Sequence, residues 1–241
     1  MMIDEDAANK AISILGSSHY FYKDSHRKIF EAMISLMNNN DPIDTVSVSD
    51  ELKKGKPNFS ILSEEIGYEK NKDTENTWIV DPIDGTVNFL HGIPHFAISI
   101  GLLSNDEIKT GLIFDPIKNE MFYAEKDNGA FFNNERIRVS KKNELSECLF
   151  ATGGKKYNSI NGITTRRSGC AALDLAYVAS GRYDGYCQSN LNLWDIAAGL
   201  IIIKEAGGVI NDINLNNHNN LNVIASSPNI NDKFIKKISN F

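Results

Sequence analysis

The sequence predicts a layered fold of the α/β class, in which helices and mainly antiparallel strands stack around a core. Short strand-like runs separated by Asn, Asp and Pro turns fill the middle of the chain, from about residue 97 to residue 139. Longer apolar stretches of helical length follow near residues 171 and 195. The chain has 241 residues, 41% of them hydrophobic, which allows one large domain or two small ones. Because helices and strands alternate, we expect mixed layers.

The first 55 residues differ from the rest of the chain and are expected to be helical. A helix is predicted from about His26 to Asn38, because six apolar side chains fall on one helical face: Ile29, Phe30, Met33, Ile34, Leu36 and Met37. Asp41-Pro42 ends this helix, and Gly55-Lys56-Pro57 is typical of a connection. The pattern changes to short strands after this connection.

The remaining elements follow in order. A meander of strands is expected at residues 97–103, 109–114, 121–124, 131–132 and 136–139. Helices are expected at residues 171–179, from Asp195 to the Gly207-Gly208 pair, and at residues 230–239. Two more strands are expected at residues 182–188 and 208–213, and the Asn-rich stretch 214–222 is predicted to be a solvated loop.

The segment from Trp78 to Thr86 contains the strongest candidates for a functional site. An apolar run, expected to be a buried strand, ends in a turn that holds Asp81 and Asp84, and Gly85-Thr86 follows. Two carboxylates this close repel each other unless a cation lies between them, and ligands that are all oxygen suit a hard cation such as Mg²⁺. The N–H groups of Gly85 and Thr86 are candidates for holding a phosphate. The segment therefore predicts a metal site beside an anion site.

Two other acidic positions are candidates for the same site. Asp195 stands at the expected start of an apolar helix, and Glu64 follows the short apolar strand Ile61-Leu62-Ser63. Taken singly, each acid has a structural explanation, as part of an Asx turn, a helix cap or a solvated acidic pair. Taken together, they favour a centre with two cations that clamps the attacking water and the leaving oxygen of a phosphate ester.

Residues 58–241 resemble the inositol monophosphatase family of metal-dependent phosphatases. The resemblance rests on four stretches in the family's order: Ser63-Glu64-Glu65, Asp81 to Thr86 with Asn88, Phe89 and His91 after it, Gly169 to Gly181, and Leu193 to Gly199 with Glu205-Ala206-Gly207-Gly208. It implies a five-layer αβαβα sandwich, a homodimer, two or three Mg²⁺ ions and inhibition by lithium. The family's two long N-terminal helices are replaced or truncated in this chain.

The resemblance also implies roles for individual residues. The expected metal ligands are Glu64, Asp81, the Ile83 carbonyl, Asp84 and Asp195, with Asp81 bridging two ions. Thr86 is expected to orient the attacking water, and Glu64 to accept its proton. Substrate contacts are expected from Asp84, Gly85, Thr86, Ala171, Gln188 and Asp195. Many members that act on inositol phosphates have Glu where this chain has Gln188, which can hydrogen-bond a diol but adds no charge.

The front of the chain resembles a different family. Residues 1–55, through His19 to Met33 and Asp41 to Leu52, resemble the N-terminal domain of the bacterial replicative helicase, a small helical module for self-association and partner contacts. We therefore expect a helical segment at residues 1–57 and a phosphatase domain at residues 58–241. Asp44 to Asp50 also fits the phosphatase family's own pattern, in which Asp50 acts with Thr86; the alternative is that Asp50 caps a short helix.

The net charge and the cysteine content limit the classes of partner and the cellular compartment that we expect. The net charge of −6 makes nucleic acid an unlikely main partner, because binding to phosphate backbones needs a basic face. Three cysteines without a Cys-x-x-Cys spacing predict free thiols in a reducing cytoplasm, and neither a signal peptide nor a membrane span is expected. The predicted function is Mg²⁺-dependent hydrolysis of small sugar or polyol monophosphates, most simply inositol 1-phosphate. The alternatives are a nucleotidase for adenosine 3′,5′-bisphosphate and a replication- or RNA-linked binding protein whose site is idle.

Overall fold

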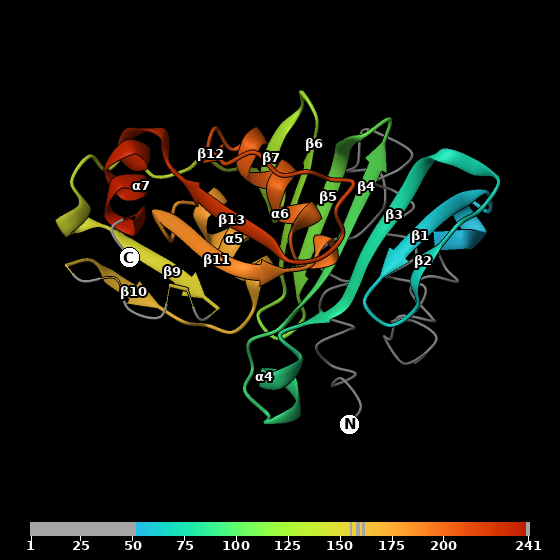
Figure 1. Ribbon diagram of the computed structural model, residues 1–241, viewed down its shortest axis with the longest axis horizontal. Helices are drawn as coiled ribbons and strands as arrows, with labels where there is room; N and C mark the ends of the chain where they lie inside the picture. Colours follow the sequence, from blue (N-terminus) through green and yellow to red (C-terminus); the bar gives the residue numbers. More distant parts are fainter. Residues whose placement is uncertain (1–51, 155, 158–159, 161, 240–241) are drawn as a thin grey trace.

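A computed structural model describes residues 52–154, 156–157, 160 and 162–239, and these form two sheets with helices between and beside them (Figure 1). The larger sheet has the strand order β2-β1-β3-β4-β5-β6-β7-β8, and the smaller sheet the order β10-β9-β11-β13-β12. Neighbouring strands are antiparallel except at β1–β3, β9–β10 and β9–β11. Mixed pairing of this kind matches the predicted α/β class.

The bounds of the elements are as follows. The larger sheet contains β1 (Phe59–Ser63), β2 (Gly67–Glu69), β3 (Asp73–Asp84), β4 (Ala97–Ser104), β5 (Glu107–Asp115), β6 (Glu120–Glu125), β7 (Gly129–Phe132) and β8 (Glu135–Arg136). The smaller sheet contains β9 (Leu149–Gly153), β10 (Thr164–Arg166), β11 (Gly185–Leu191), β12 (Val209–Ile210) and β13 (Leu221–Ser226). The helices are α4 (Thr86–Leu90), α5 (Ala171–Ala179), α6 (Leu193–Glu205) and α7 (Asn231–Ser239).

Helices α5 and α6 form the layer between the two sheets. One core cluster joins apolar side chains of both helices to the inner faces of β3–β7 and of β9, β11 and β13. Gly111 on β5 permits the close approach of α6, because a Cβ there would lie 2.6 Å from the Ala198 carbonyl oxygen. Gly199 does the same between the helices, where a Cβ would lie 2.5 Å from the Leu175 side chain. The start of α6 is therefore held tightly against the larger sheet.

Each sheet also has a buried outer face. Helix α7 packs on the smaller sheet, where the Phe234 ring stacks on Phe150 of β9 with centroids 4.5 Å apart. The outer face of the larger sheet carries a separate cluster: Leu52, Ile61, Trp78, Val80, Ile98, Ile100, Leu102, Leu112, Phe114 and Met121. The described residues thus form the sheet–helix–sheet–helix layers of the expected αβαβα sandwich. The helix expected at residues 26–38 lies outside the described part of the chain.

Several strand boundaries differ from the prediction. Residues 137–139 are not a strand, because the Val139 N–H bonds to Ala206 at the end of α6 instead of to a neighbouring strand. Strand β12 is two residues long and leads directly into the loop that was expected around residues 214–222. Strand β11 begins at Gly185 and not at Arg182. The predictions at 97–103, 109–114, 121–124, 171–179 and 230–239 are confirmed to within two residues.

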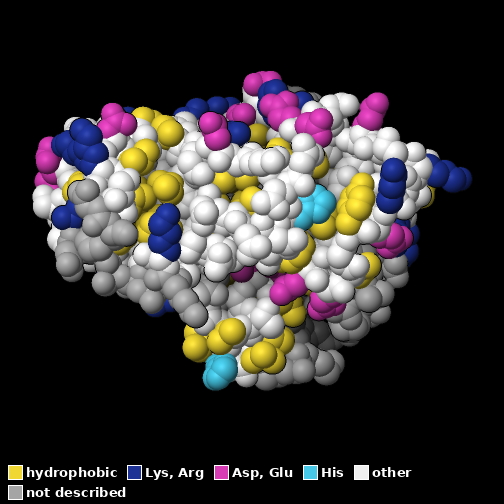
Figure 2. All heavy atoms as spheres, viewed as in Figure 1, with side chains coloured by type: hydrophobic (Ala, Val, Ile, Leu, Met, Phe, Trp, Pro, Cys, Tyr) yellow, Lys and Arg dark blue, Asp and Glu magenta, His cyan; other side chains and the backbone are white. Residues whose placement is uncertain are grey.

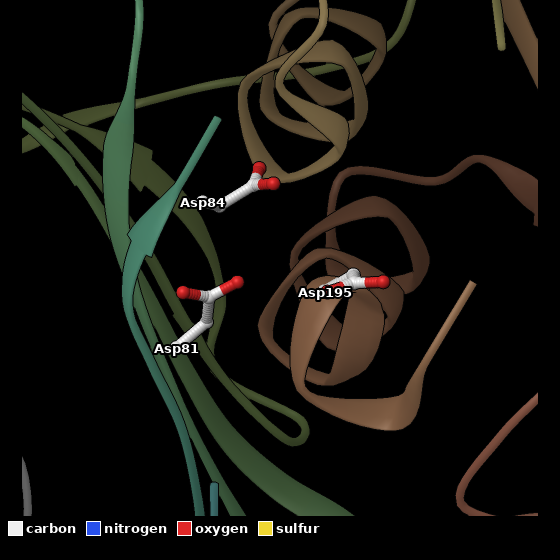
Figure 3. A group of neighbouring side chains, drawn as sticks. All are labelled: Asp81, Asp84 and Asp195. Carbon is white, nitrogen blue, oxygen red and sulfur yellow. The ribbon is translucent and has the colours of Figure 1, made fainter. Parts of the chain in front are cut away.

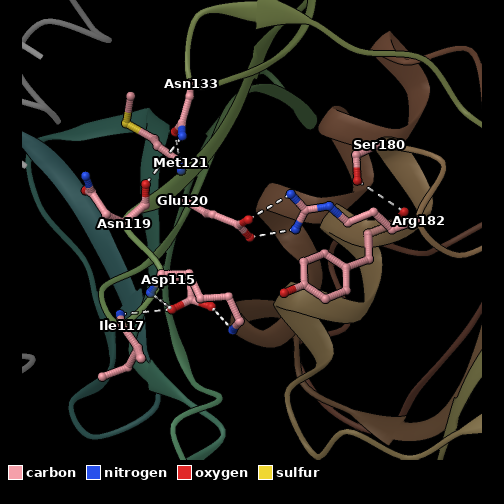
Figure 4. A network of polar contacts seen from close by, with 10 residues as sticks. Asp115, Ile117, Asn119, Glu120, Met121, Asn133, Ser180 and Arg182 are labelled. Atoms are coloured by element: carbon pink, nitrogen blue, oxygen red, sulfur yellow. Dashed lines mark hydrogen bonds and ion pairs between the residues drawn. The ribbon is translucent and has the colours of Figure 1, made fainter. Parts of the chain in front are cut away.

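Arg182 explains the late start of β11. Its guanidinium forms two bonds of 2.6 and 2.8 Å with Glu120 of β6 (Figure 4) and lies over the rings of Phe122, Phe132 and Tyr177. Gly181 has a φ of 72°, which turns the chain out of α5 toward this contact. The residues after α5 therefore tie the helix layer to the larger sheet before β11 starts.

Two further observations concern the cysteines and the length of the helices in the described residues. Cys148, Cys170 and Cys187 are free, as expected, and all three thiols are buried. None of the helices in the described ranges is long and apolar enough to cross a membrane.

Candidate metal centre

Asp81 and Asp84 occupy the end of β3, where an irregularity in the strand places them on one face. In a regular strand, residues three apart point to opposite faces. Here Asp81 pairs with Ser99 and Asp84 with Ala97, so three steps on β3 match two on β4. This extra residue reverses the alternation. Both carboxylates consequently point toward the ends of the two central helices (Figure 3).

Asp195 reaches the same place from α6. It is the third residue of the helix, and Asn192 occupies the N-cap position that the sequence suggested for Asp195. Its carboxylate accepts a 2.7 Å hydrogen bond from the Asn192 N–H. One ligand oxygen from each of Asp81, Asp84 and Asp195 lies within 4.8 Å of the others. These three residues are called the acid trio below.

Backbone groups hold the two β3 carboxylates in place. Asp81 accepts a 3.0 Å bond from the Ile83 N–H. Asp84 accepts a 2.6 Å bond from the Ala172 N–H in the first turn of α5 and a 3.0 Å bond from the Cys170 thiol. The side chains of the trio are therefore oriented before any ligand binds, because their positions depend on the main chain and on buried neighbours.

The electrostatics of the trio favour a bound cation. Burial and, to a smaller extent, the nearby charges of Asp84, Asp195 and Glu64 together raise the pKa of Asp81 to about 9. Burial also raises the pKa of Asp195 to about 7. The pKa of Asp84 is raised by burial as well, but the bonds from Cys170 and Ala172 oppose this increase. Buried carboxylates that repel one another become stable as anions when a cation pairs with them.

The donor set fits a hard cation. All three ligating groups are carboxylates, which suit Mg²⁺, Mn²⁺ or Ca²⁺ better than softer metals. The Cys170 thiol is adjacent, but burial and the charge of Asp84 raise its pKa well above the ordinary value. It stays protonated and donates to Asp84, so it is not a thiolate ligand.

Glu64 and Thr86 lie at the exposed front of the site. Glu64 follows β1, is solvent-exposed and is not a member of the 4.8 Å group. Its charge nevertheless raises the pKa values of Asp81, Asp84 and Asp195, so it is near all three. The exposed Thr86 donates its hydroxyl to the Ile83 carbonyl at 3.0 Å. That carbonyl and hydroxyl, both predicted as site groups, are thus in direct contact.

Gly85 connects the strand to α4. It adopts a φ of 91°, and a Cβ there would lie 3.1 Å from the His95 carbonyl oxygen and 3.3 Å from the Cys170 Cβ. Both the backbone conformation and the close packing therefore require glycine. The turn places the Thr86 N–H at the start of α4, beside Asp84.

The remaining predicted residues come from the helix layer and the smaller sheet. Ala171 is the buried first residue of α5, next to the Ala172 N–H that binds Asp84. Gln188 is half-buried on β11, and its Oε1 accepts a 2.9 Å bond from the Tyr186 hydroxyl. Asp50, the predicted partner of Thr86, lies outside the described residues.

Two supporting residues, Asp174 and Asn88, were assigned no role from the sequence. Asp174 is buried in α5 and accepts a 2.7 Å bond from Ser168, and burial raises its pKa well above the ordinary value. The sequence does contain a signal for Asp174, since it is an acidic residue in the otherwise apolar run from Ala171 to Ala179. Asn88 donates to the carbonyls of His95 and Ser168, which ties the turn after β3 to the loop before α5.

Two protein-family models match parts of the chain. The sequence model of the inositol monophosphatase family matches residues 44–241, and that of the DnaB-like helicase N terminal domain matches residues 1–67. The first match begins before the expected residue 58, and the two ranges overlap.

Individual relatives span most of the chain. A fructose-1,6-bisphosphatase/inositol-1-monophosphatase of Thermotoga maritima is 44% identical over 80% of this chain and 78% of its own length. A Nus factor SuhB of Pasteurella multocida is 34% identical over 96% of this chain and 92% of its own. The crystal structure of the extragenic suppressor protein suhB of Bartonella henselae superposes with a TM-score of 0.74 at 41% identity, covering 80% of each chain.

Proposed function

This chain belongs to the inositol monophosphatase family of metal-dependent phosphoric monoester hydrolases, and we propose that it hydrolyses small sugar or polyol monophosphates, most simply inositol 1-phosphate. The observation that carries the proposal is the meeting of Asp81, Asp84 and Asp195 from two distant parts of the sequence. Three buried carboxylates lower the stability of the folded protein unless a cation binds to them.

The proposed cofactor is Mg²⁺, with two or three ions. The residues that would hold them are Glu64, Asp81, the Ile83 carbonyl, Asp84 and Asp195. When bound, such ions neutralise phosphate oxygens and lower the pKa of water, which is the chemistry that phosphate ester hydrolysis needs.

Side-chain and main-chain groups of the protein would transfer the proton, orient the water and bind the substrate. Glu64 is proposed to accept the proton of the attacking water; partial burial and the neighbouring Glu65 raise its pKa, which makes it a stronger base. The Thr86 hydroxyl is proposed to orient that water, and the N–H groups of Gly85 and Thr86 to bind phosphate oxygens. Ala171 and Gln188 would contact the hydroxyls of the substrate, and Asp84 and Asp195 also border it. The attack is in line, and no covalent enzyme intermediate forms.

The test is phosphate release from a panel of monophosphates with Mg²⁺ and with EDTA. The informative variant is Asp84→Asn, and the matched control is Asp106→Asn, which changes an exposed aspartate in the β4–β5 turn. Activity that needs Mg²⁺, is lost in Asp84→Asn and is kept in Asp106→Asn supports the proposal. Hydrolysis that persists in Asp84→Asn, or that EDTA leaves unchanged, contradicts it. Adding lithium to the same assay tests the proposed inhibition.

A second candidate function is a binding role without hydrolysis. Some relatives are named Nus factor SuhB, and residues 1–67 match a helicase N-terminal domain. A folded protein that binds Mg²⁺ but releases phosphate from no substrate, adenosine 3′,5′-bisphosphate included, would favour this role. Hydrolysis of that bisphosphate in preference to inositol 1-phosphate would favour the nucleotidase alternative.

We also keep the homodimer and the cytoplasmic location as proposals. An apolar patch on the projecting α4 segment supports self-association, since Val87, Leu90 and Ile93 are all exposed there (Figure 2). Light scattering of the purified protein, compared with Leu90→Asp, tests the dimer. A dimer mass that drops to the monomer in the variant supports it, and a monomeric parent protein contradicts it.

The proposed division of the chain is a helical segment at residues 1–57 and a phosphatase domain at residues 58–241. Leu52, which precedes the proposed boundary, belongs to the buried cluster on the outer face of the larger sheet. Deletion of residues 1–51 tests whether the front completes the phosphatase core. A soluble, active remainder identifies the front as an appendage, and an aggregated remainder shows that it completes the core.

A further inference from the structure

Glu64 lies in the turn of a hairpin at the edge of the larger sheet. It follows β1 directly, and the chain turns back into β2, the outermost strand in the sheet order. The Ile66 N–H donates a 3.3 Å hydrogen bond to the Ser63 hydroxyl across this turn, and Gly67 has a φ of 72°. Within the described ranges, β2 pairs with β1 alone. The hairpin that carries Glu64 therefore has sheet support on one side only.

Tyr68 of β2 lies on the side of this hairpin that faces the helix layer. It is directly opposite Leu62 in the antiparallel register of β1 and β2, and opposite residues share one face of a sheet. Leu62 belongs to the core cluster that includes side chains of α5 and α6. Tyr68 continues this face beyond the core, and 48% of its surface stays exposed. Its ring is therefore placed to meet a group from the surroundings of α6.

That group is the side chain of His218. The two ring centroids lie 5.9 Å apart at an interplanar angle of 56°, which is a tilted aromatic contact. The His218 carbonyl accepts a 2.9 Å hydrogen bond from the N–H of Leu193, the first residue of α6. Its main chain is thus bonded to the helix start that carries Asp195, and its ring contacts the hairpin that carries Glu64.

The loop before β13 holds His218 in place. The Asn214 side chain accepts a 3.1 Å bond from the Asn216 N–H, and the Asn214 carbonyl accepts a 3.1 Å bond from the Asn217 N–H. Turns of this kind close a loop on itself. Leu215 packs on the core between the sheets. The loop is therefore anchored to the core and to α6, whereas the hairpin opposite it is an edge element.

Resting on the cation site of the proposed function, we propose that Tyr68 and His218 are positioning residues whose ring contact holds the β1–β2 hairpin against the start of α6. The contact then fixes the distance between Glu64 and the acid trio. The trio has main-chain hydrogen bonds of its own and does not need this contact. Without it, the Glu64 carboxylate moves away from the trio, so that it binds a cation less well and acts less well on water.

The first experiment measures Mg²⁺ binding and hydrogen exchange, which need no substrate. In Tyr68→Ala, isothermal titration should show an Mg²⁺ affinity about fivefold weaker than that of the parent protein. The amides of residues 63–69 should also exchange faster in the metal-free variant. Tyr68→Phe keeps the ring and should restore both properties. The matched control is Ile66→Ala, which removes a comparably exposed side chain from the same hairpin and should behave like the parent protein.

A double-mutant cycle tests whether the two rings act together. His218→Ala should reproduce the effects of Tyr68→Ala, and the double variant should lose no more Mg²⁺ affinity than either single variant. Losses that add in the double variant would mean that the rings act independently, which overturns the proposed contact.

The second experiment connects the contact to Glu64. With inositol 1-phosphate at saturating Mg²⁺, Tyr68→Ala should lower kcat about fivefold and leave KM nearly unchanged, because the trio and the substrate-binding groups stay in place. In a Glu64→Gln background the same substitution should cause no further loss, because the group that it positions is already absent. A further loss in that background would mean that Tyr68 acts on some other part of the site, which contradicts the proposal.

The remaining outcomes separate this inference from the proposed function. If Tyr68→Ala binds Mg²⁺ as tightly as the parent protein, or if Ile66→Ala weakens binding equally, the positioning role is wrong even if the protein is a phosphatase. If the binding effects appear but the parent protein hydrolyses no monophosphate, the proposed function fails and the positioning role stands. A parent protein that binds no Mg²⁺ contradicts both.

Discussion

The acid trio and the front of the site are built differently. Asp81, Asp84 and Asp195 are largely enclosed, and main-chain N–H groups hold each of their carboxylates. Glu64 and Thr86 are exposed, and the Thr86 hydroxyl bonds to the adjacent Ile83 carbonyl. The difference suggests a division of labour, in which the trio binds cations in a fixed geometry and the front residues act on the water. Changes to the trio should abolish cation binding, and changes to the front should slow the reaction while cations still bind.

The largest effect is expected from Asp84→Asn. The amide keeps an oxygen for the Ala172 N–H but loses the negative charge, so activity should fall on the order of 10³-fold. Thermal unfolding with and without Mg²⁺ checks the cause: the Mg²⁺-dependent rise in Tm should disappear. Asp106→Asn should keep both the activity and the rise. A variant that loses activity but keeps the rise would place Asp84 outside the cation site.

A smaller loss of activity is expected from Glu64→Gln. Removal of a general base typically costs about 10²-fold or more, while the trio remains intact. Isothermal titration with Mg²⁺ should still detect binding in this variant, weakened by the loss of one proposed ligand, because the trio keeps the others. Glu65→Gln, the adjacent exposed acid, is the control and should be nearly normal. Equal losses in both variants would mean that general negative charge matters at this edge and that Glu64 has no specific role.

Thr86→Ala should have a still smaller effect. It removes the hydroxyl that bonds to the Ile83 carbonyl, and loss of one such positioning group is expected to lower kcat by about tenfold. Thr86→Ser keeps the hydroxyl and should restore most of the activity. If the serine variant is as slow as the alanine variant, the methyl group and not the hydroxyl is what the site requires.

The smallest effect concerns the stability of the metal-free protein at different pH values. Asp81 and Asp195 have folded-state pKa values raised to about 9 and about 7, above those of an unfolded aspartate. Between the pKa of an unfolded aspartate, about 4, and these raised values, the folded state binds more protons than the unfolded state. The free energy of unfolding therefore falls as the pH rises through this range. In EDTA, the Tm should drop by a few degrees from pH 5 to pH 9, and saturating Mg²⁺ should reduce this drop. A Tm that rises over this range would contradict the repulsion within the trio.

Much of this site was predictable from the order of its motifs. The spacing of Asp81 and Asp84 before Gly85, together with Asp195 at a helix start, indicated that three acids meet. The sequence did not reveal why they can meet. A three-residue spacing on a regular strand separates two side chains, and only the irregular pairing of β3 with β4 places both on one face.

Elements with weak local patterns were harder to predict. Strands β9, β10 and β13 were not assigned, because their pairing depends on partners far away in the chain. The start of β11 was misplaced because Arg182 bonds to Glu120, a tertiary contact that local sequence does not encode. Similarly, the position of the Gln188 amide depends on contacts with Tyr186 and Gly153 that form only in the folded protein.

The most direct test is anomalous diffraction from a crystal of the full chain soaked in Mn²⁺, which replaces Mg²⁺ at oxygen sites and scatters anomalously. We expect at least one strong peak within coordination distance of carboxylate oxygens from Asp81, Asp84 and Asp195 together, and no such peak in a crystal of Asp84→Asn. Manganese bound elsewhere, with these three carboxylates unligated, would contradict the shared cation site on which the proposed hydrolysis depends.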